Sequence, residues 1–181
     1  MGCFWGVEHL FRELDGVLDT DVGYAGGTVD TPTYRQVTTG ATGAAEAVRI
    51  TFDPSVVSYE EILRYFFRLH DPTTLNRQGP DFGSQYRSAI FAEDAVQQEA
   101  ARQKIAQVDA SGKWPNPVVT EVNLGGTFWP AEDYHQDYYK GTKRVLTRFG
   151  AVKQSDAYKR YRIGCGRDAR VEELWGSDAP F

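Results

Sequence analysis

The stretch Ala45-Glu46-Ala47-Val48-Arg49-Ile50-Thr51-Phe52 carries apolar side chains at alternate positions. Successive side chains of a strand point to opposite faces, so this alternation predicts a β-strand with one apolar face. Asp53-Pro54 follows at once and ends the strand, because proline has no N–H to donate to a sheet. We therefore expect the fold to be built around this strand.

A helix is expected directly after it. Ser58 and Glu61 have the spacing of a capping box, in which each side chain accepts a hydrogen bond from the other residue's main-chain N–H. The apolar residues that follow recur at helical spacing and form one face: Ile62, Leu63, Phe66, Phe67 and Leu69. Asp71-Pro72 closes this helix.

The remaining chain also mixes helices and strands. Strands are expected over 17–23, 85–91 and 118–124, and helices just after Cys3, over 94–110 and over 131–139. Because these elements do not alternate strictly, the pattern favours the α+β class. We expect a two-layer sandwich with a central mixed β-sheet, a ferredoxin-like core and an irregular C-terminal tail.

Length and composition predict a single domain over residues 1–181. The chain has 181 residues, 41% of them hydrophobic, which is enough for one well-buried core. No apolar run approaches the ~18 residues of a membrane span, and no secretory leader precedes the first motif. The two cysteines, Cys3 and Cys165, suit a reducing compartment, so we expect a cytoplasmic protein without a membrane partner.

The charge is negative overall but unevenly distributed. A net charge of −5 argues against nucleic acid as the main partner. The segment 140–181 is basic, with ten Lys and Arg against five Asp and Glu. We expect this basic C-terminal segment, which contains Cys165, to wrap the core. Val171, Leu174 and Trp175 recur there at helical spacing, which suggests an anchored segment.

Cys3 is placed for chemistry. It precedes an amphipathic helix in which Val7, Leu10, Phe11 and Leu14 share a face. A helix N-terminus favours negative charge and lowers the pKa of a thiol, which reacts as the thiolate. The alternative is a small buried hydrophobic residue without chemical function.

Glu46 lies on the apolar face of its strand, with Val48, Ile50 and Phe52. Burial without a charge partner disfavours the carboxylate, so we expect a raised pKa and a carboxyl able to donate a proton. The alternative is a carboxylate near the strand end that reaches water.

Two other classes of function remain open from the residues alone. A cysteine hydrolase would use Cys3 as nucleophile with His9, His70 or His135 as base. A structural zinc site would use both cysteines and two histidines, but no closely spaced pair of such ligands supports it.

Seven short motifs in order resemble the peptide methionine sulfoxide reductase A family, over residues 2 to about 140. They are Gly2-Cys3-Phe4-Trp5-Gly6, Val22-Gly23-Tyr24-Ala25-Gly26-Gly27, Pro32-Thr33-Tyr34, Thr42-Gly43-Ala44-Ala45-Glu46, His70-Asp71-Pro72-Thr73, Gln85-Tyr86-Arg87-Ser88 and Ala131-Glu132-Asp133-Tyr134-His135-Gln136. The resemblance implies a reductase for methionine S-sulfoxide, free or in oxidised proteins, that acts in protein repair.

The resemblance also implies roles for individual residues. Cys3 would attack the sulfoxide sulfur, and Phe4 and Trp5 would form the apolar wall for the substrate methyl group. Glu46 would donate a hydrogen bond or proton to the sulfoxide oxygen. The remaining residues that the resemblance implicates are Tyr34 and Tyr86, as phenol donors to the same oxygen, and Asp81, at the substrate end of the pocket.

Recycling would need a second thiol and a reductant, and no metal or prosthetic cofactor. The sulfenic acid left on Cys3 would condense with Cys165 to a disulfide that thioredoxin or a small dithiol reduces. The anchored appearance of the segment around Cys165 leaves open whether it reaches Cys3. We expect a monomer.

The chain departs from the family pattern at two further points. Ala44 stands where many members have histidine, which changes the surroundings of Glu46. Only Met1 and Gly2 precede the cysteine motif, where members usually have a strand. The sheet is therefore expected to lack an edge strand.

Overall fold

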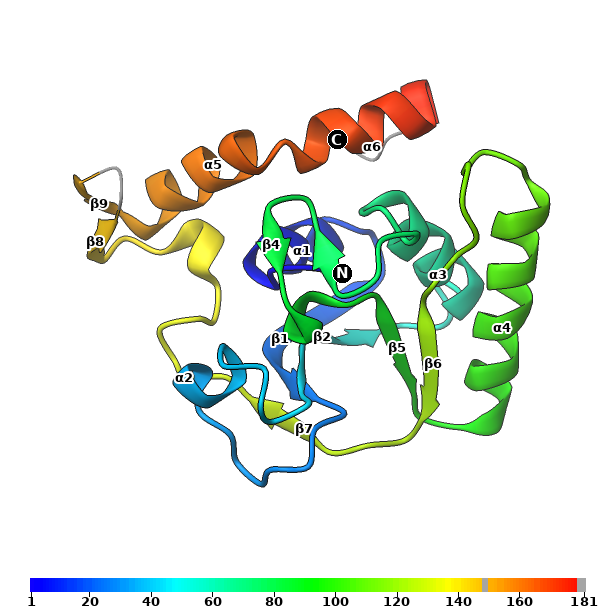
Figure 1. Cartoon of the computed structure of the whole chain (residues 1–181), viewed down its shortest axis with the longest axis horizontal. Coiled ribbons are helices and arrows are strands. Elements are labelled where there is room, and N and C mark those ends of the chain that lie inside the picture. Colours follow the sequence, from blue (N-terminus) through cyan, green and yellow to red (C-terminus); the bar gives the residue numbers. More distant parts are fainter. Residues whose placement is uncertain (148–149, 179–181) are drawn as a thin grey trace.

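The computed structural model describes residues 1–147 and 150–178, without the side chains of Arg167, Leu174 and Asp178 (Figure 1). It is a mixed α/β structure in which helices flank small sheets. Within these residues no helix is long and apolar enough to cross a membrane.

The strand that alternation predicts is confirmed. It forms β2 (Ala45–Phe52), which pairs antiparallel with β1 (Val17–Ala25) and sets Glu46 opposite Tyr24. β7 (Phe128–Pro130) pairs with the other edge of β1, giving the order β2-β1-β7. Glu46 therefore lies at one end of this three-stranded sheet.

The other strands do not join this sheet in the part of the chain that the structure describes. β5 (Ala89–Ala92) pairs in parallel with β6 (Glu121–Leu124), and α4 (Ala95–Ala110) connects the two. A hairpin joins β3 (Arg77–Gln78) to β4 (Asp81–Phe82). Separate small sheets thus replace the single central mixed sheet that the sequence predicted.

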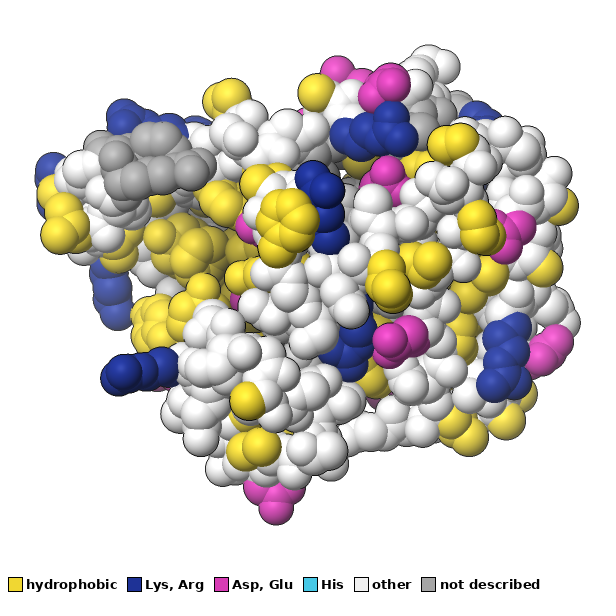
Figure 2. Space-filling model, viewed as in Figure 1, with side chains coloured by type: hydrophobic (Ala, Val, Ile, Leu, Met, Phe, Trp, Pro, Cys, Tyr) yellow, Lys and Arg dark blue, Asp and Glu magenta, His cyan; other side chains and the backbone are white. Residues whose placement is uncertain are grey.

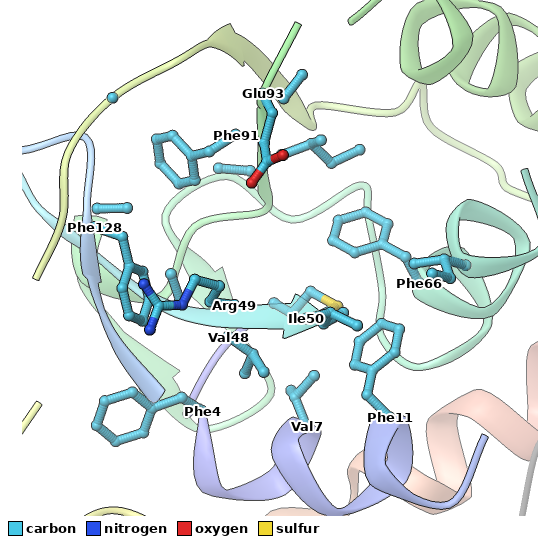
Figure 3. A pocket seen from close by; sticks show the side chains of 18 of the residues that line it. Phe4, Val7, Phe11, Val48, Arg49, Ile50, Phe66, Phe91, Glu93 and Phe128 are labelled. Atoms are coloured by element: carbon cyan, nitrogen blue, oxygen red, sulfur yellow. The ribbon is translucent and has the colours of Figure 1, made fainter. Parts of the chain in front are cut away.

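A cavity of about 460 Å³ separates β2 from β5 and is lined by residues of both strands (Figure 3). Most of its lining is apolar, including Val48 and Ile50 on one side and Phe91 on the other. At the edge of the cavity a main-chain hydrogen bond fixes the N-terminal residues: Gly2 N donates to the carbonyl oxygen of Tyr86 at 3.1 Å.

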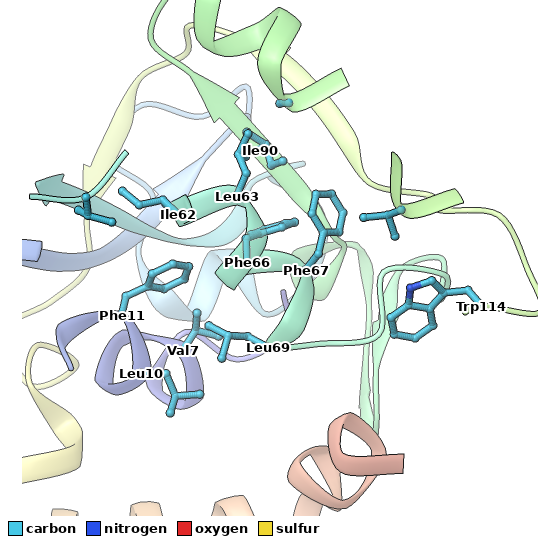
Figure 4. Packing of buried hydrophobic residues seen from close by; sticks show 13 residues of the cluster. Val7, Leu10, Phe11, Ile62, Leu63, Phe66, Phe67, Leu69, Ile90 and Trp114 are labelled. Atoms are coloured by element: carbon cyan, nitrogen blue, oxygen red, sulfur yellow. The ribbon is translucent and has the colours of Figure 1, made fainter. Parts of the chain in front are cut away.

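The main core lies between α1 (Trp5–Arg12), α3 (Tyr59–Arg68) and α4 (Figure 4). Its central side chains are those that helical spacing selects, among them Val7, Phe11, Ile62, Leu63, Phe66 and Phe67. The cap of α3 is also confirmed, because Ser58 Oγ accepts from Glu61 N at 3.2 Å. The Glu61 side chain pairs with Arg64 instead of completing the capping box.

The helix expected over 131–139 is wrong. This segment consists of turns that end in the 3₁₀ helix η2 (Tyr138–Lys140). The reason is a long-range contact: Gln136 accepts from Val22 N at 2.9 Å and donates to Val22 O at 2.9 Å. These bonds hold the segment on β1, and the left-handed main chain of Asp137 (φ 51°) interrupts any continuous helix there.

The strand expected over 85–91 is too long. Its first residues form η1 (Ser84–Tyr86), and β5 begins only at Ala89. The segment 31–42 contains a short helix that the sequence did not predict, α2 (Tyr34–Val37). Thr33 and Gln36 cap it reciprocally.

The prediction of an irregular C-terminal tail is also wrong. The segment forms a hairpin and helices: β8 (Arg144–Thr147), β9 (Gly150–Lys153), α5 (Gln154–Cys165), α6 (Arg167–Trp175) and η3 (Gly176–Asp178). Two anchors order it. Arg162 Nη1 donates to Gly6 O at 3.0 Å, and Val171 is completely buried.

Candidate active site

Cys3 lies immediately before α1, where the sequence places it. It is a reduced thiol, 8% exposed, and Gly6 N donates to its carbonyl oxygen at 3.2 Å. It belongs to a buried cluster with Phe4, Val22 and Tyr24, against which Trp5, Tyr34, Tyr86 and Tyr161 pack. We call this group of residues the Cys3 cluster.

Glu46 faces the start of α1. Its Oε2 accepts a hydrogen bond from the main-chain N–H of Phe4 at 3.0 Å, and the residue is 5% exposed. The alternative in which this carboxyl reaches water is therefore wrong. The hydrogen bond fixes the acid next to the residue that follows Cys3.

Tyr34 and Tyr86 both pack against the Cys3 cluster. Burial raises the pKa of both phenols, and the negative charges of Glu46 and Cys3 raise it further. Such charge effects weaken with distance, so the two phenols share their surroundings with the acid and the thiol. Both phenols stay protonated near neutral pH and can donate hydrogen bonds.

Asp81 joins the site from β4. Its charge also raises the pKa of both phenols, and its carboxylate accepts a hydrogen bond from the Tyr161 hydroxyl. Tyr161 comes from α5, so the basic C-terminal segment contributes a side chain to the Cys3 cluster. Tyr161 was not among the predicted site residues. Its partner Asp81 is 80 positions away in the sequence, so no local pattern marks the contact.

Phe4 and Trp5 differ in exposure. Phe4 is 1% exposed and packs against Tyr24 with ring centroids 6.0 Å apart. Trp5 is only partly buried and stacks on Tyr138 at 3.8 Å with nearly parallel planes. On the surface, hydrophobic side chains gather in a hollow between α5 and α2, beside the β3–β4 hairpin (Figure 2).

Two residues of the loop before η2 support the aromatic groups. The Trp5 indole N–H donates to His135 Nδ1 at 3.1 Å. Glu132 accepts from Tyr34 N at 2.9 Å and from the Tyr24 hydroxyl at 2.8 Å. The motif 131–136 contains both residues, but these contacts could not be predicted from the sequence because their partners are about a hundred positions away.

Cys165 is not part of the Cys3 cluster. It is the last residue of α5, and its Sγ donates to Arg162 O at 3.2 Å. Its main chain approaches the β3–β4 hairpin, because a Cβ on Gly79 would lie 3.2 Å from Cys165 O. The second thiol is thus held at a helix end beside the strand that carries Asp81.

The histidines give no support to the hydrolase alternative. His9 Nδ1 is 3.1 Å from the Tyr158 hydroxyl. His70 lies between Phe66 O at 2.9 Å and Ser88 Oγ at 2.8 Å, and His135 accepts from Trp5. Among residues 1–147 and 150–178, no group of three or more His, Cys, Asp or Glu is arranged to hold a metal ion.

Comparison with known proteins gives one consistent result. The family model for peptide methionine sulfoxide reductase matches residues 1–177. The chain is 54% identical over 138 residues to peptide methionine sulfoxide reductase MsrA of Methanoculleus marisnigri, covering 76% of this chain and 84% of the relative. It is 45% identical over 177 residues to the longer MsrA/MsrB protein of Vibrio cholerae, covering 98% of this chain and 44% of that protein.

Solved structures agree. Methionine sulfoxide reductase A of Corynebacterium diphtheriae superposes with a TM-score of 0.70 at 35% identity, covering 84% of this chain and 80% of that chain. Reduced Mxr1 of Saccharomyces cerevisiae gives a TM-score of 0.69 at 40% identity, covering 76% of this chain and 79% of that chain.

Proposed function

Since the chain belongs to the peptide methionine sulfoxide reductase family, we propose that Cys3 is the nucleophile with which it reduces methionine sulfoxide. The chain is a peptide-methionine (S)-S-oxide reductase, an oxidoreductase of protein repair. The observation that carries the residue assignment is that one thiol and two protonated phenols meet in the Cys3 cluster, and that the buried carboxyl of Glu46 accepts a hydrogen bond from Phe4 of the same cluster.

The first step transfers oxygen from sulfur to sulfur. The Cys3 thiolate attacks the sulfoxide sulfur and forms a sulfur–sulfur bond while the sulfoxide oxygen takes up a proton. The oxygen then passes as hydroxyl to the Cys3 sulfur as the original S–O bond and the sulfur–sulfur bond break, which releases methionine and leaves Cys3 as a sulfenic acid. The thiol loses two electrons and the sulfoxide gains them. Tyr34 and Tyr86 donate hydrogen bonds to the oxygen as its negative charge develops, and Glu46 supplies a proton.

The same arrangement supports selection of one sulfoxide epimer. The sulfur carries an oxygen, a methyl group and the rest of the side chain, so it is chiral. The oxygen is held by the phenols and Glu46, and the methyl group packs against Trp5 and Phe4. With Cys3 attacking from a fixed direction, only one epimer satisfies both contacts, and membership of the family supports S as that epimer. Asp81 then borders the substrate end of the site.

The second step returns the thiol. Cys165 attacks the Cys3 sulfenic acid, water leaves, and a disulfide forms that thioredoxin or a small dithiol reduces by thiol–disulfide exchange. No prosthetic group is required in this cycle. Cys165 lies outside the Cys3 cluster and donates to Arg162 O, so we propose that the end of α5 opens to deliver its thiol to Cys3.

We further propose that residues 1–181 form a single domain whose basic C-terminal segment, 140–181, wraps a two-layer core. The contacts of α5 with α1 support the wrapping. The presence of only two cysteines, far apart in the sequence, suits a reducing compartment and supports a cytoplasmic location. The net charge of −5 supports protein and amino-acid substrates over nucleic acid, and we propose a monomer.

Mass spectrometry after one equivalent of methionine (S)-S-oxide without reductant tests this cycle. We expect one equivalent of methionine and a Cys3–Cys165 disulfide, with the Cys3 sulfenic acid trapped when dimedone is present. Cys3→Ser is the control and should give no methionine. Substantial methionine formation by well-folded Cys3→Ser would refute the assignment, and turnover without oxidation of any thiol would favour another chemistry.

A further inference from the structure

The Trp5 indole is fixed from two directions. Tyr138 stacks on its face, with ring centroids 3.8 Å apart and planes 8° from parallel. Its N–H donates to His135 Nδ1 at 3.1 Å. Stacking alone leaves the ring free to slide and rotate in its own plane. The hydrogen bond removes that freedom, because it fixes one edge of the ring.

His135 is itself held rigidly. It is 1% exposed, and its ring contacts Phe4 at 5.2 Å, Tyr34 at 4.5 Å and Tyr134 at 4.2 Å between centroids. Phe4, Trp5 and Tyr34 thus all meet on one imidazole. Among the aromatic rings of the described residues, only that of His135 contacts all three.

The contacts also define the tautomer. Nδ1 accepts the indole N–H, so the proton of the neutral ring is on Nε2. Nε2 has no hydrogen-bond partner within the described residues and lies 4.0 Å from Glu132 Oε2. Burial lowers the pKa of His135 to about 4, against the opposing charge of Glu132. The ring is therefore neutral at physiological pH and keeps its acceptor.

We infer that His135 is a positioning residue, which orients Trp5 so that its indole receives the methyl group of the sulfoxide. This inference rests on the proposed role of Trp5 as the methyl-binding wall. Dispersion contacts fall off steeply with distance, so a wall recognises a methyl group only if the ring is held at the right place. The rings of Phe4, Tyr34 and Tyr134 hold the imidazole in place, and the imidazole aligns the indole.

A matched pair of variants separates the hydrogen bond from packing. His135→Phe keeps a ring but removes the acceptor, whereas His135→Asn keeps an acceptor oxygen close to the position of Nδ1. We expect KM for methionine (S)-S-oxide to rise roughly tenfold in His135→Phe, with the single-turnover rate at saturating substrate nearly unchanged. His135→Asn should keep KM close to the wild-type value. A general structural defect would instead lower the rate and leave KM in place.

The indole N–H gives a readout that is independent of activity. In ¹H–¹⁵N spectra its resonance is identified by its loss in Trp5→Phe. It should be strongly shifted and slow to exchange in the wild type and in His135→Asn, and should move toward the position of a free indole in His135→Phe. Long-range ¹H–¹⁵N spectra of the wild type alone should show the neutral Nε2–H tautomer, so the test does not depend on a variant folding.

The outcomes separate this inference from the proposed function. A raised KM in Trp5→Phe together with a wild-type KM in His135→Phe would overturn the positioning role and leave Trp5 as the wall. An Nδ1–H tautomer would overturn it as well, because that ring cannot accept from the indole. An unchanged KM in Trp5→Phe would refute the methyl-binding wall itself.

Discussion

Glu8 should make the stability of this protein depend on pH in a specific way. It lies on α1, is 1% exposed, and its Oε1 accepts from Asp137 N at 3.3 Å. Its Oε2 has no hydrogen-bond partner among the described residues. Burial raises the pKa of Glu8 from its ordinary 4.5 to about 7, although the hydrogen bond from Asp137 opposes this. The folded protein therefore keeps this carboxyl protonated well above the pH at which the unfolded chain ionises.

The sign and size of the effect follow. Below pH 4.5 both states hold the proton, and Glu8 adds no pH dependence. As the pH rises from 4.5 to about 7 the unfolded chain is favoured, because only it gains the hydrated charge. At ~1.4 kcal/mol for each tenfold change in the ionisation constant, the loss reaches roughly 3 kcal/mol above pH 7. This is a large part of the ~5–15 kcal/mol of an ordinary domain.

Glu8→Gln removes this titration while keeping the size of the side chain. The buried amide carries its own desolvation cost, but that cost does not change with pH. The free energy of unfolding of Glu8→Gln relative to the wild type should therefore increase by roughly 3 kcal/mol between pH 4.5 and pH 8. Urea unfolding at a series of pH values, with reductant present, measures this difference. Glu99→Gln, an exposed change on α4, is the control and should give a flat difference. If the free energies of unfolding of Glu8→Gln and the wild type change with pH in parallel, the reasoning is refuted.

Three further changes test the site. Glu46→Gln keeps a hydrogen-bond donor but loses the transferable proton, so the single-turnover rate at saturating sulfoxide should fall by ~10²–10⁴-fold with a smaller effect on KM; an unchanged rate would exclude proton donation by Glu46. Tyr86→Phe removes one donor to the developing charge and should lower the same rate by ~10²-fold, whereas a change in KM alone would make Tyr86 only a binding residue. Cys165→Ser should still form one equivalent of methionine but lose thioredoxin-coupled turnover, with partial rescue by dithiothreitol; full coupled turnover would show that Cys165 is structural.

Features set by neighbouring residues could be predicted from the sequence. The alternation around Val48 and Ile50 specifies β2, Ser58 specifies the start of α3, and Cys3 precedes α1 as expected. Each depends on residues within one strand or one helical turn. The burial of Glu46 follows from the same alternation, because its face of β2 is the apolar one.

Features set by distant residues could not be predicted. The segment around Gln136 was expected to be helical, but its amide bonds to Val22, more than a hundred positions earlier. The C-terminal segment was expected to be irregular, but Arg162 reaches Gly6 across most of the chain. The positioning role of His135 could not be predicted for the same reason, because it depends on a hydrogen bond from Trp5, 130 positions earlier in the sequence. Such pairs have no local pattern that marks them.

The position of Tyr161 has a consequence for the order of events in the catalytic cycle. Tyr161 packs on the Cys3 cluster and bonds to Asp81, and it lies one helical turn before Cys165. On the proposed cycle, opening the end of α5 to deliver Cys165 also disturbs the side chain that closes the substrate end of the site. Product departure and delivery of the second thiol are then successive events that cannot overlap. At saturating sulfoxide, excess methionine should slow disulfide formation while formation of the sulfenic acid keeps its rate, and rapid-quench mass spectrometry can follow both steps. Equal rates of disulfide formation with and without methionine would contradict this order. The enzyme would thus be protected from closing its disulfide while a substrate still occupies the site.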